Sequence, residues 1–146
     1  MRDITNPVFH DEEKARIFLE KERWPHGVVC PFCNKGDGVS VLNGKSIGAG
    51  WYYCNPCDQA KFTVRTGSIM ERSHVPLAKW AMAFRLIAAS KKGMSSKQLQ
   101  RMLGVSYRTA WFIGHRIREA MSPDAKDCDR RTLSNPARFM VLVRGS

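Results

Sequence analysis

Two Cys-x-x-Cys pairs constrain the fold of this chain more than any other feature. They are Cys30-Pro-Phe-Cys33 and Cys54-Asn-Pro-Cys57, with 20 residues between Cys33 and Cys54. The intervening residues contain two strand-like stretches, Val39–Leu42 and Trp51–Tyr53, and a turn signal at Asn43-Gly44. A hairpin that brings two such cysteine turns together completes a tetrahedral four-sulfur site. The spacing therefore predicts a zinc ribbon whose ligands are Cys30, Cys33, Cys54 and Cys57.

A redox dithiol and buried free cysteines are the alternatives at these four positions. A redox motif uses one pair at a strand–helix junction, which two pairs on a hairpin do not provide. Since four protein ligands leave no open coordination position, we expect a structural zinc ion and not a catalytic one. His26 and His74 lack ligand spacing and are expected at the surface, while Cys128 stands alone and is expected as a free thiol.

The positive charge of the chain is concentrated in its second half. Lys and Arg number 24 against 13 Asp and Glu, a net charge of +11. Residues 1–75 contain 10 basic and 9 acidic residues, whereas residues 76–146 contain 14 and 4. Within Pro76–Met121 there are 9 basic residues and one acid, Glu119. Such a concentration usually faces a polyanion, and a solvated basic surface is the alternative.

This basic segment has the pattern of three helices. The first begins near Pro76 and runs to Ser90, the second is capped by Ser95 or Ser96, and the third is capped by Ser106 after a turn at Gly104. On a helical wheel, one face of the third helix collects Ala110, Ile113, Gly114, Ile117, Ala120 and Met121. A short turn between two helices predicts a helix-turn-helix, and a plain helical bundle is the alternative.

A helix-turn-helix places the start of its second helix at base edges in the major groove of DNA. The expected DNA contacts on that helix are Ser106, Tyr107, Arg108, Thr109, Phe112, His115 and Arg116. The expected phosphate contacts before it are Lys91, Lys92, Lys97 and Arg101, for which solvated side chains are the alternative. We expect Trp111 in the core, and packing on another domain is the alternative for Phe112.

The fold class expected is α+β, a small zinc ribbon of short antiparallel strands followed by a three-helix helix-turn-helix unit. An N-terminal helix over Asp11–Trp24 precedes the ribbon, and Phe62-Thr-Val64 is expected to add a third strand. The domains predicted are 1–27, the N-terminal helix; 28–66, the ribbon; 75–121, the helix-turn-helix unit; and 122–146, a poorly ordered tail.

Membrane and secreted classes do not fit the sequence. No apolar run approaches the roughly 18 residues of a membrane helix. The first residues, Met1–Pro7, lack the apolar core of a signal peptide. We therefore expect a cytoplasmic, nucleoid-associated protein.

With both motifs in this order, the chain resembles the N-terminal region of the zinc-ribbon insertion-sequence transposases of bacteria. The resemblance extends from about Phe9 to Met121. It is carried by Trp24–Cys33, Cys54–Cys57, Phe62–Trp80, Ser90–Leu99, Leu103–Trp111 and His115–Met121. It implies recognition of the terminal inverted repeats of an element on double-stranded DNA. It also implies association with a second copy or with a full-length transposase.

The resemblance ends where the family places its ribonuclease-H-like catalytic domain. The 25 residues after Met121 are too few for that domain. Asp124, Asp127 and Asp129 lie on a polar stretch, whereas the family places its first catalytic Asp on an apolar strand. We therefore expect no catalytic residue and no strand transfer, as in a truncated transposase. The alternative functions are a stand-alone transcriptional regulator and a zinc-stabilised protein-interaction module.

Overall fold

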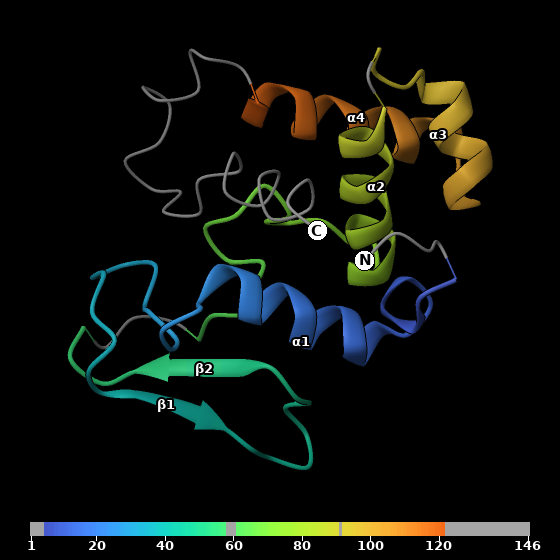
Figure 1. The fold of residues 1–146 in the computed structure, drawn as a ribbon. Coiled ribbons are helices and arrows are strands. Elements are labelled where there is room, and N and C mark those ends of the chain that lie inside the picture. Colours follow the sequence, from blue (N-terminus) through green and yellow to red (C-terminus); the bar gives the residue numbers. More distant parts are fainter. Residues whose placement is uncertain (1–4, 58–60, 91, 122–146) are drawn as a thin grey trace.

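Helices and one β-hairpin account for the regular structure in the computed structural model, which describes residues 5–57, 61–90 and 92–121. In chain order the elements are a 3₁₀ turn, Pro7–Phe9; α1, Glu12–Arg23; β1, Val39–Leu42; β2, Trp51–Cys54; α2, Leu77–Ala89; α3, Ser96–Leu103; and α4, Tyr107–Met121 (Figure 1). The expected α+β class, a ribbon hairpin followed by three helices, is confirmed.

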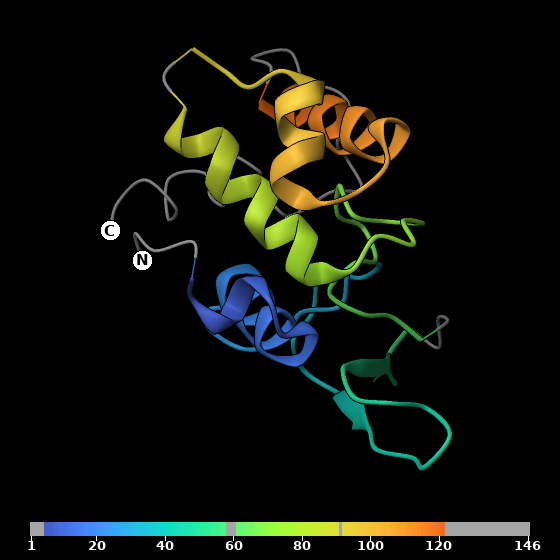
Figure 2. The same cartoon turned by 90° about the vertical axis from the view of Figure 1, so that its right-hand side faces the viewer.

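Helix α2 is the centre of the helical part. Of its 13 residues, 10 are buried, because α1 covers one side of it while α3 and α4 cover another (Figure 2). Trp80 has no exposed surface, and its ring packs against Phe84 and Phe112 at centroid distances of 6.0 and 6.4 Å. This arrangement explains why all but two residues of α2, Lys79 and Arg85, are apolar.

Helices α3 and α4 form the helix-turn-helix. The Ser95 hydroxyl accepts a hydrogen bond from the Gln98 N–H at 3.2 Å and caps α3. The helix ends at Gly104, whose φ of 64° is left-handed. The Ser106 hydroxyl then accepts from the Thr109 N–H at 3.2 Å at the start of α4. Local capping chemistry therefore sets both ends of the turn.

The buried face of α4 agrees with the helical wheel over most of its length. Ala110, Ile113, Gly114 and Ile117 are buried. Ala120 is half-buried and Met121 is exposed, so the buried face ends before the last turn of α4. The tight packing of these two helices fixes the orientation of the opposite face of α4.

The hairpin pairs β1 and β2 antiparallel, with Val39 opposite Cys54 and Leu42 opposite Trp51. A second small core lies beneath it, where Tyr52 stacks on Phe62 at 5.7 Å and Trp24 meets both rings edge-on. This core is separate from the larger one around α2, although Trp24 packs against both. The molecule therefore has two hydrophobic clusters.

Two expectations from the sequence are wrong. Phe62–Val64 does not form a third strand: Phe62 makes one isolated antiparallel bridge to Tyr52, and the backbone turns directly afterwards. Thr63 and Thr66 hold that turn through hydrogen bonds, which compete with further strand pairing. Trp111 is not in the core but is 47% exposed, since the smaller residues of α4 fill the contact with its neighbours.

The N-terminal helix agrees with its prediction, with Asp11 as its cap. The Asp11 carboxylate accepts from the Glu13 N–H at 3.0 Å, and these backbone hydrogen bonds lower the pKa of Asp11. The predictions for Lys91, for Cys128 and for the tail, 122–146, concern residues outside the described part of the chain. In the described part, no helix is long and apolar enough to cross a membrane.

Candidate metal centre and nucleic-acid interface

The first cysteine pair lies on a tight turn directly after Val29. The Cys30 N–H donates to the Lys35 carbonyl and the Asn34 N–H donates to the Cys30 carbonyl, both at 3.0 Å. Asn34 adopts a left-handed φ of 59°, which asparagine tolerates. The Phe32 N–H points at the Cys30 sulfur, at 3.4 Å. The turn therefore presents both sulfurs on one side.

The second pair follows the end of β2. Cys54 is the last residue of that strand, and the Asn55 N–H donates to the Gly38 carbonyl at 3.1 Å. Gly38 has a φ of +80°, and a Cβ atom there would lie 2.8 Å from Pro56. A glycine at this position allows the chain before β1 to approach the second turn. Strand pairing and this contact together bring the two cysteine turns to the same end of the hairpin.

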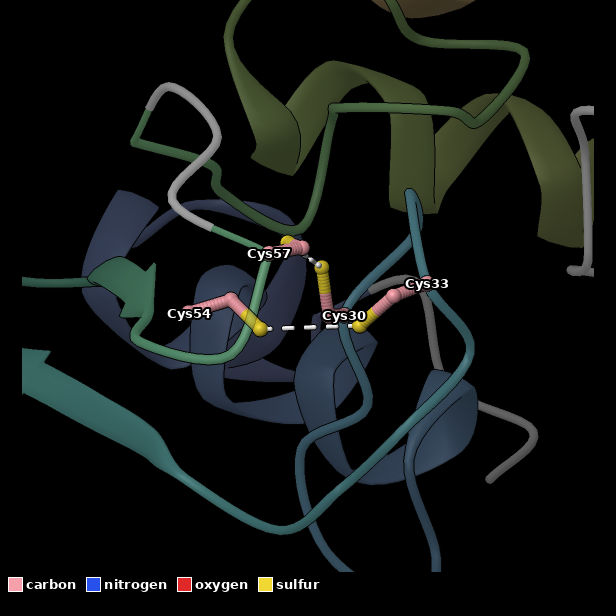
Figure 3. Close-up of side chains that lie close together, drawn as sticks. All are labelled: Cys30, Cys33, Cys54 and Cys57. Atoms are coloured by element: carbon pink, nitrogen blue, oxygen red, sulfur yellow. Dashed lines mark hydrogen bonds between the residues drawn. The ribbon is translucent and has the colours of Figure 1, made fainter.

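The four sulfur atoms meet in one cluster (Figure 3). Cys30 and Cys57 are 3.6 Å apart at their sulfurs, Cys33 and Cys54 are 3.5 Å apart, and all four sulfurs lie within 4.8 Å of one another. A tetrahedral zinc ion with bonds of about 2.3 Å needs sulfurs about 3.8 Å apart. The cluster fits zinc, and the predicted zinc cofactor is confirmed.

Burial makes two of these thiols poor acids in the absence of metal. It raises the pKa of Cys54 to about 12 and also raises the pKa of Cys30. The Lys35 N–H, by contrast, lowers the pKa of Cys33. Zinc binding has to displace the protons that remain, because the thiolate is the ligand. His26 and His74 are exposed, as expected.

Most of the expected DNA contacts are exposed on α3, on α4 and just before α3. Lys92, Lys97, Arg101, Ser106, Tyr107, Arg108 and His115 are exposed, and Thr109 is half-buried, with its hydroxyl 2.8 Å from that of Ser106. The Lys97 ammonium lies 5.2 Å from the centroid of the Tyr107 ring. The first turns of α3 and α4 therefore share one surface.

Phe112 and Arg116 instead contact the rest of the molecule. Arg116 donates from Nη1 to the carbonyls of Ile69 and Glu71, at 2.7 and 2.8 Å. Its guanidinium lies 4.6 Å over the ring of Phe112, which packs edge-on against Trp80. The ring contact of Phe112 is with Trp80, which lies in the same predicted unit, 75–121, and not in another domain. Arg116 therefore connects α4 to the loop that precedes α2.

Two further cations of the basic segment also have internal partners that the sequence did not reveal. Lys79 donates to the Leu103 carbonyl at 2.6 Å, and Arg118 donates to the Met94 carbonyl at 2.9 Å. Some of the cations that favoured a polyanionic ligand, Lys79 and Arg118, therefore stabilise helix ends and loops. The cations exposed to a ligand in this region include Lys92, Lys97, Arg101 and Arg108.

Comparison with known proteins agrees with the zinc ribbon. Residues 10–60 match the family described as the transposase zinc-ribbon domain. A protein of the archaeon Halobacterium salinarum, named an uncharacterized protein in transposable element ISH50, is 31% identical over 129 residues. The match covers 88% of this chain and 40% of that protein. No solved structure matches. The chain thus carries a transposase-type zinc ribbon and is similar, over most of its length, to a protein of an insertion element.

Proposed function

We propose that this chain is the DNA-recognition part of an insertion-sequence transposase and binds the terminal inverted repeats of its element. The observation that carries the proposal is the surface shared by α3 and α4, where Lys97 meets Tyr107 and Arg108 is exposed beside it. A helix-turn-helix inserts the first turns of its second helix into the major groove. The similarity to a protein of a transposable element supports the choice of that element's ends as the target.

Within this proposal, the side chains divide by chemistry. The Arg108 guanidinium has the fork that reads guanine through two hydrogen bonds. The Ser106 and Thr109 hydroxyls suit phosphate or base edges, while Lys92, Lys97 and Arg101 suit phosphates. Binding to chromosomal DNA would place the protein at the nucleoid.

The proposal assigns recognition to residues 5–121, and neither strand cleavage nor strand joining. In the described part of the chain, the group that could hold a metal ion is the four-cysteine cluster. Four cysteines complete the coordination of zinc and leave no position for water or phosphate. We therefore give the zinc ion a structural role.

The test is a titration of the zinc-loaded chain with labelled duplex DNA at several salt concentrations. One duplex carries the inverted repeat that borders the element encoding this chain, and the other carries the same bases scrambled. We expect tighter binding to the repeat, with affinity falling steeply as salt rises. Equal affinity for both duplexes would leave only a basic surface, and no binding at moderate salt would contradict the proposal.

A protein-interaction module is the second candidate, because the ribbon displays apolar side chains. Phe32, Val41 and Trp51 are all exposed, and Val41 is 56% exposed. Such residues on a small domain can form a protein contact. This function predicts that the chain binds no duplex DNA at physiological salt, so the same titration separates the two candidates.

A further inference from the structure

Trp111 is a large apolar side chain that the fold does not bury. It is 47% exposed on the second turn of α4, although the opposite face of that helix is filled by Ala110, Ile113 and Ile117, which have almost no exposed surface. An exposed tryptophan adds little to helix stability, because aromatic residues are mediocre helix formers. Because the fold leaves the indole of Trp111 exposed, it is accessible to a ligand.

The indole belongs to a row of rings on α4. Tyr107 precedes it by four residues and His115 follows it by four, so the three side chains lie on the same side of the helix. The Trp111 and His115 rings are 4.1 Å apart at their centroids and tilted by 39°. This ring contact restricts the orientation of the indole before any ligand arrives.

The charge around this row indicates the chemistry of its partner. The exposed cations Lys97 and Arg108 lie at its first turn, where Lys97 is 5.2 Å from the Tyr107 ring; α3 contains no acidic residue, and the exposed acid on α4, Glu119, lies at the far end of the row. Two copies of this surface facing each other would oppose like charges, which disfavours a dimer contact. The major groove of DNA combines phosphates along its edges with one apolar group on its floor, the C5 methyl of thymine.

We propose that Trp111 contacts the bases from α4 and recognises thymine through its C5 methyl group. The inference rests on the function proposed above, since it needs α4 to enter the major groove. It adds an apolar contact to a reading surface whose other side chains are polar or charged. Trp111 then adds to the specificity that Arg108 gives, whereas Lys97 and Arg101 contribute to overall affinity.

The test uses the zinc-loaded full chain and a duplex that this chain selects from a random-sequence pool. Each thymine of that duplex is replaced in turn by uracil, which differs from it by the missing methyl group. At the contacted position we expect the wild-type affinity to fall about fourfold, the effect of one buried methyl group. Trp111→Ala should bind the thymine duplex more weakly and should no longer distinguish thymine from uracil there.

Ile17→Ala is the matched control. Ile17 is also an exposed apolar residue, on α1, which lies on the other side of α2 (Figure 2). We expect this variant to keep both the affinity and the discrimination of the wild type. Far-UV circular dichroism of both variants reports whether the helices remain folded. Partial recovery by Trp111→Phe would support an apolar contact.

The outcomes separate this inference from the proposed function. If Trp111→Ala binds and discriminates as the wild type does, the inference is overturned while DNA recognition by the helix-turn-helix stands. If the variant instead dissociates a wild-type dimer and leaves DNA binding unchanged, the inference is also overturned, because the surface is then a dimer contact. If the wild type selects no duplex at all, the proposed function fails as well.

Discussion

Glu12 contributes to the structure far from its own place in the sequence. Its carboxylate oxygens accept hydrogen bonds from the N–H groups of Leu77 and Ala78, at 2.8 and 3.1 Å. Pro76, at the start of α2, has no side chain that could cap the helix. Arg65 also reaches Glu12, at 3.4 Å. One exposed glutamate therefore joins α1, the loop after the ribbon and the first turn of α2.

Replacing Glu12 tests this long-range cap. We expect Glu12→Ala to lower the free energy of unfolding by about 1 kcal/mol, the usual contribution of a helix cap. Urea denaturation followed by circular dichroism measures the change. Glu13→Ala is the control, because Glu13 is exposed and its nearest cation, Arg16, is 3.9 Å away. Equal effects of the two substitutions would contradict the capping role.

Arg108 and Arg116 differ in role although both lie on α4. Arg108 is exposed, while Arg116 holds the carbonyls of Ile69 and Glu71. We expect Arg108→Ala to weaken binding to the inverted-repeat duplex by about 1–3 kcal/mol without changing the urea midpoint. Arg116→Ala should lower the free energy of unfolding by about 1.5–3 kcal/mol, the range for hydrogen bonds with a charged partner. If Arg116→Ala is as stable as the wild type, the hydrogen bonds from Arg116 to Ile69 and Glu71 do not stabilise the fold.

Among the elements, the hairpin depends on its contact with the second cysteine turn. Strand pairing fixes Val39 opposite Cys54, and the hydrogen bond from the Asn55 N–H to the Gly38 carbonyl closes the end of the hairpin. The two-residue span of a cysteine turn is a local feature, whereas the meeting of two such turns requires this register. The zinc site is therefore a property of the hairpin as a unit.

Gly38→Ala should damage the hairpin more than an ordinary substitution at a turn. The added Cβ atom would both strain a φ of +80° and lie 2.8 Å from Pro56. We expect weaker zinc binding, measured by competition with a chromophoric chelator. Gly48→Ala provides the comparison, since its φ is +48° but no atom lies within 4 Å of its Cβ position. If both variants bind zinc equally, the close approach to Pro56 does not matter.

At the scale of the whole molecule, the zinc site lies beside one of the two hydrophobic clusters and not the other. One cluster contains Cys30, Tyr52, Cys54 and Phe62, beside the metal site. The other surrounds α2 and includes residues of α1, α3 and α4. Trp24 packs against both clusters, and Arg23 donates a hydrogen bond to the Val64 carbonyl between them. Burial of the Arg23 side chain at this position lowers the pKa of its guanidinium to about 10.

Removing zinc should therefore unfold one part and spare the other. Structural zinc sites contribute roughly 10–16 kcal/mol of apparent binding free energy in small peptides, more than a two-stranded hairpin supplies by itself. After chelation, we expect fast hydrogen exchange at the amides of β1 and β2 and continued protection in α2. Cys54→Ser should reproduce this pattern. Loss of protection in α2 on chelation would mean that the helical cluster depends on the metal.

The sequence by itself determined the parts of this protein that rest on local chemistry. The cysteine spacing predicted the ligands, and Asp11, Ser95 and Gly104 marked helix ends, because ligand turns and caps involve residues within a few positions of one another. The apolar spacing on α4 predicted most of its buried face for the same reason.

Only the tertiary structure decided which of the remaining side chains face a ligand. Trp111 is exposed and Arg116 is engaged internally because the packing of α4 on its neighbours sets the direction of each side chain. Phe62 makes one bridge instead of a strand, and Glu12 caps a helix 65 residues away. These features depend on contacts between distant segments, whose positions follow from the packing of the whole chain and not from any local pattern.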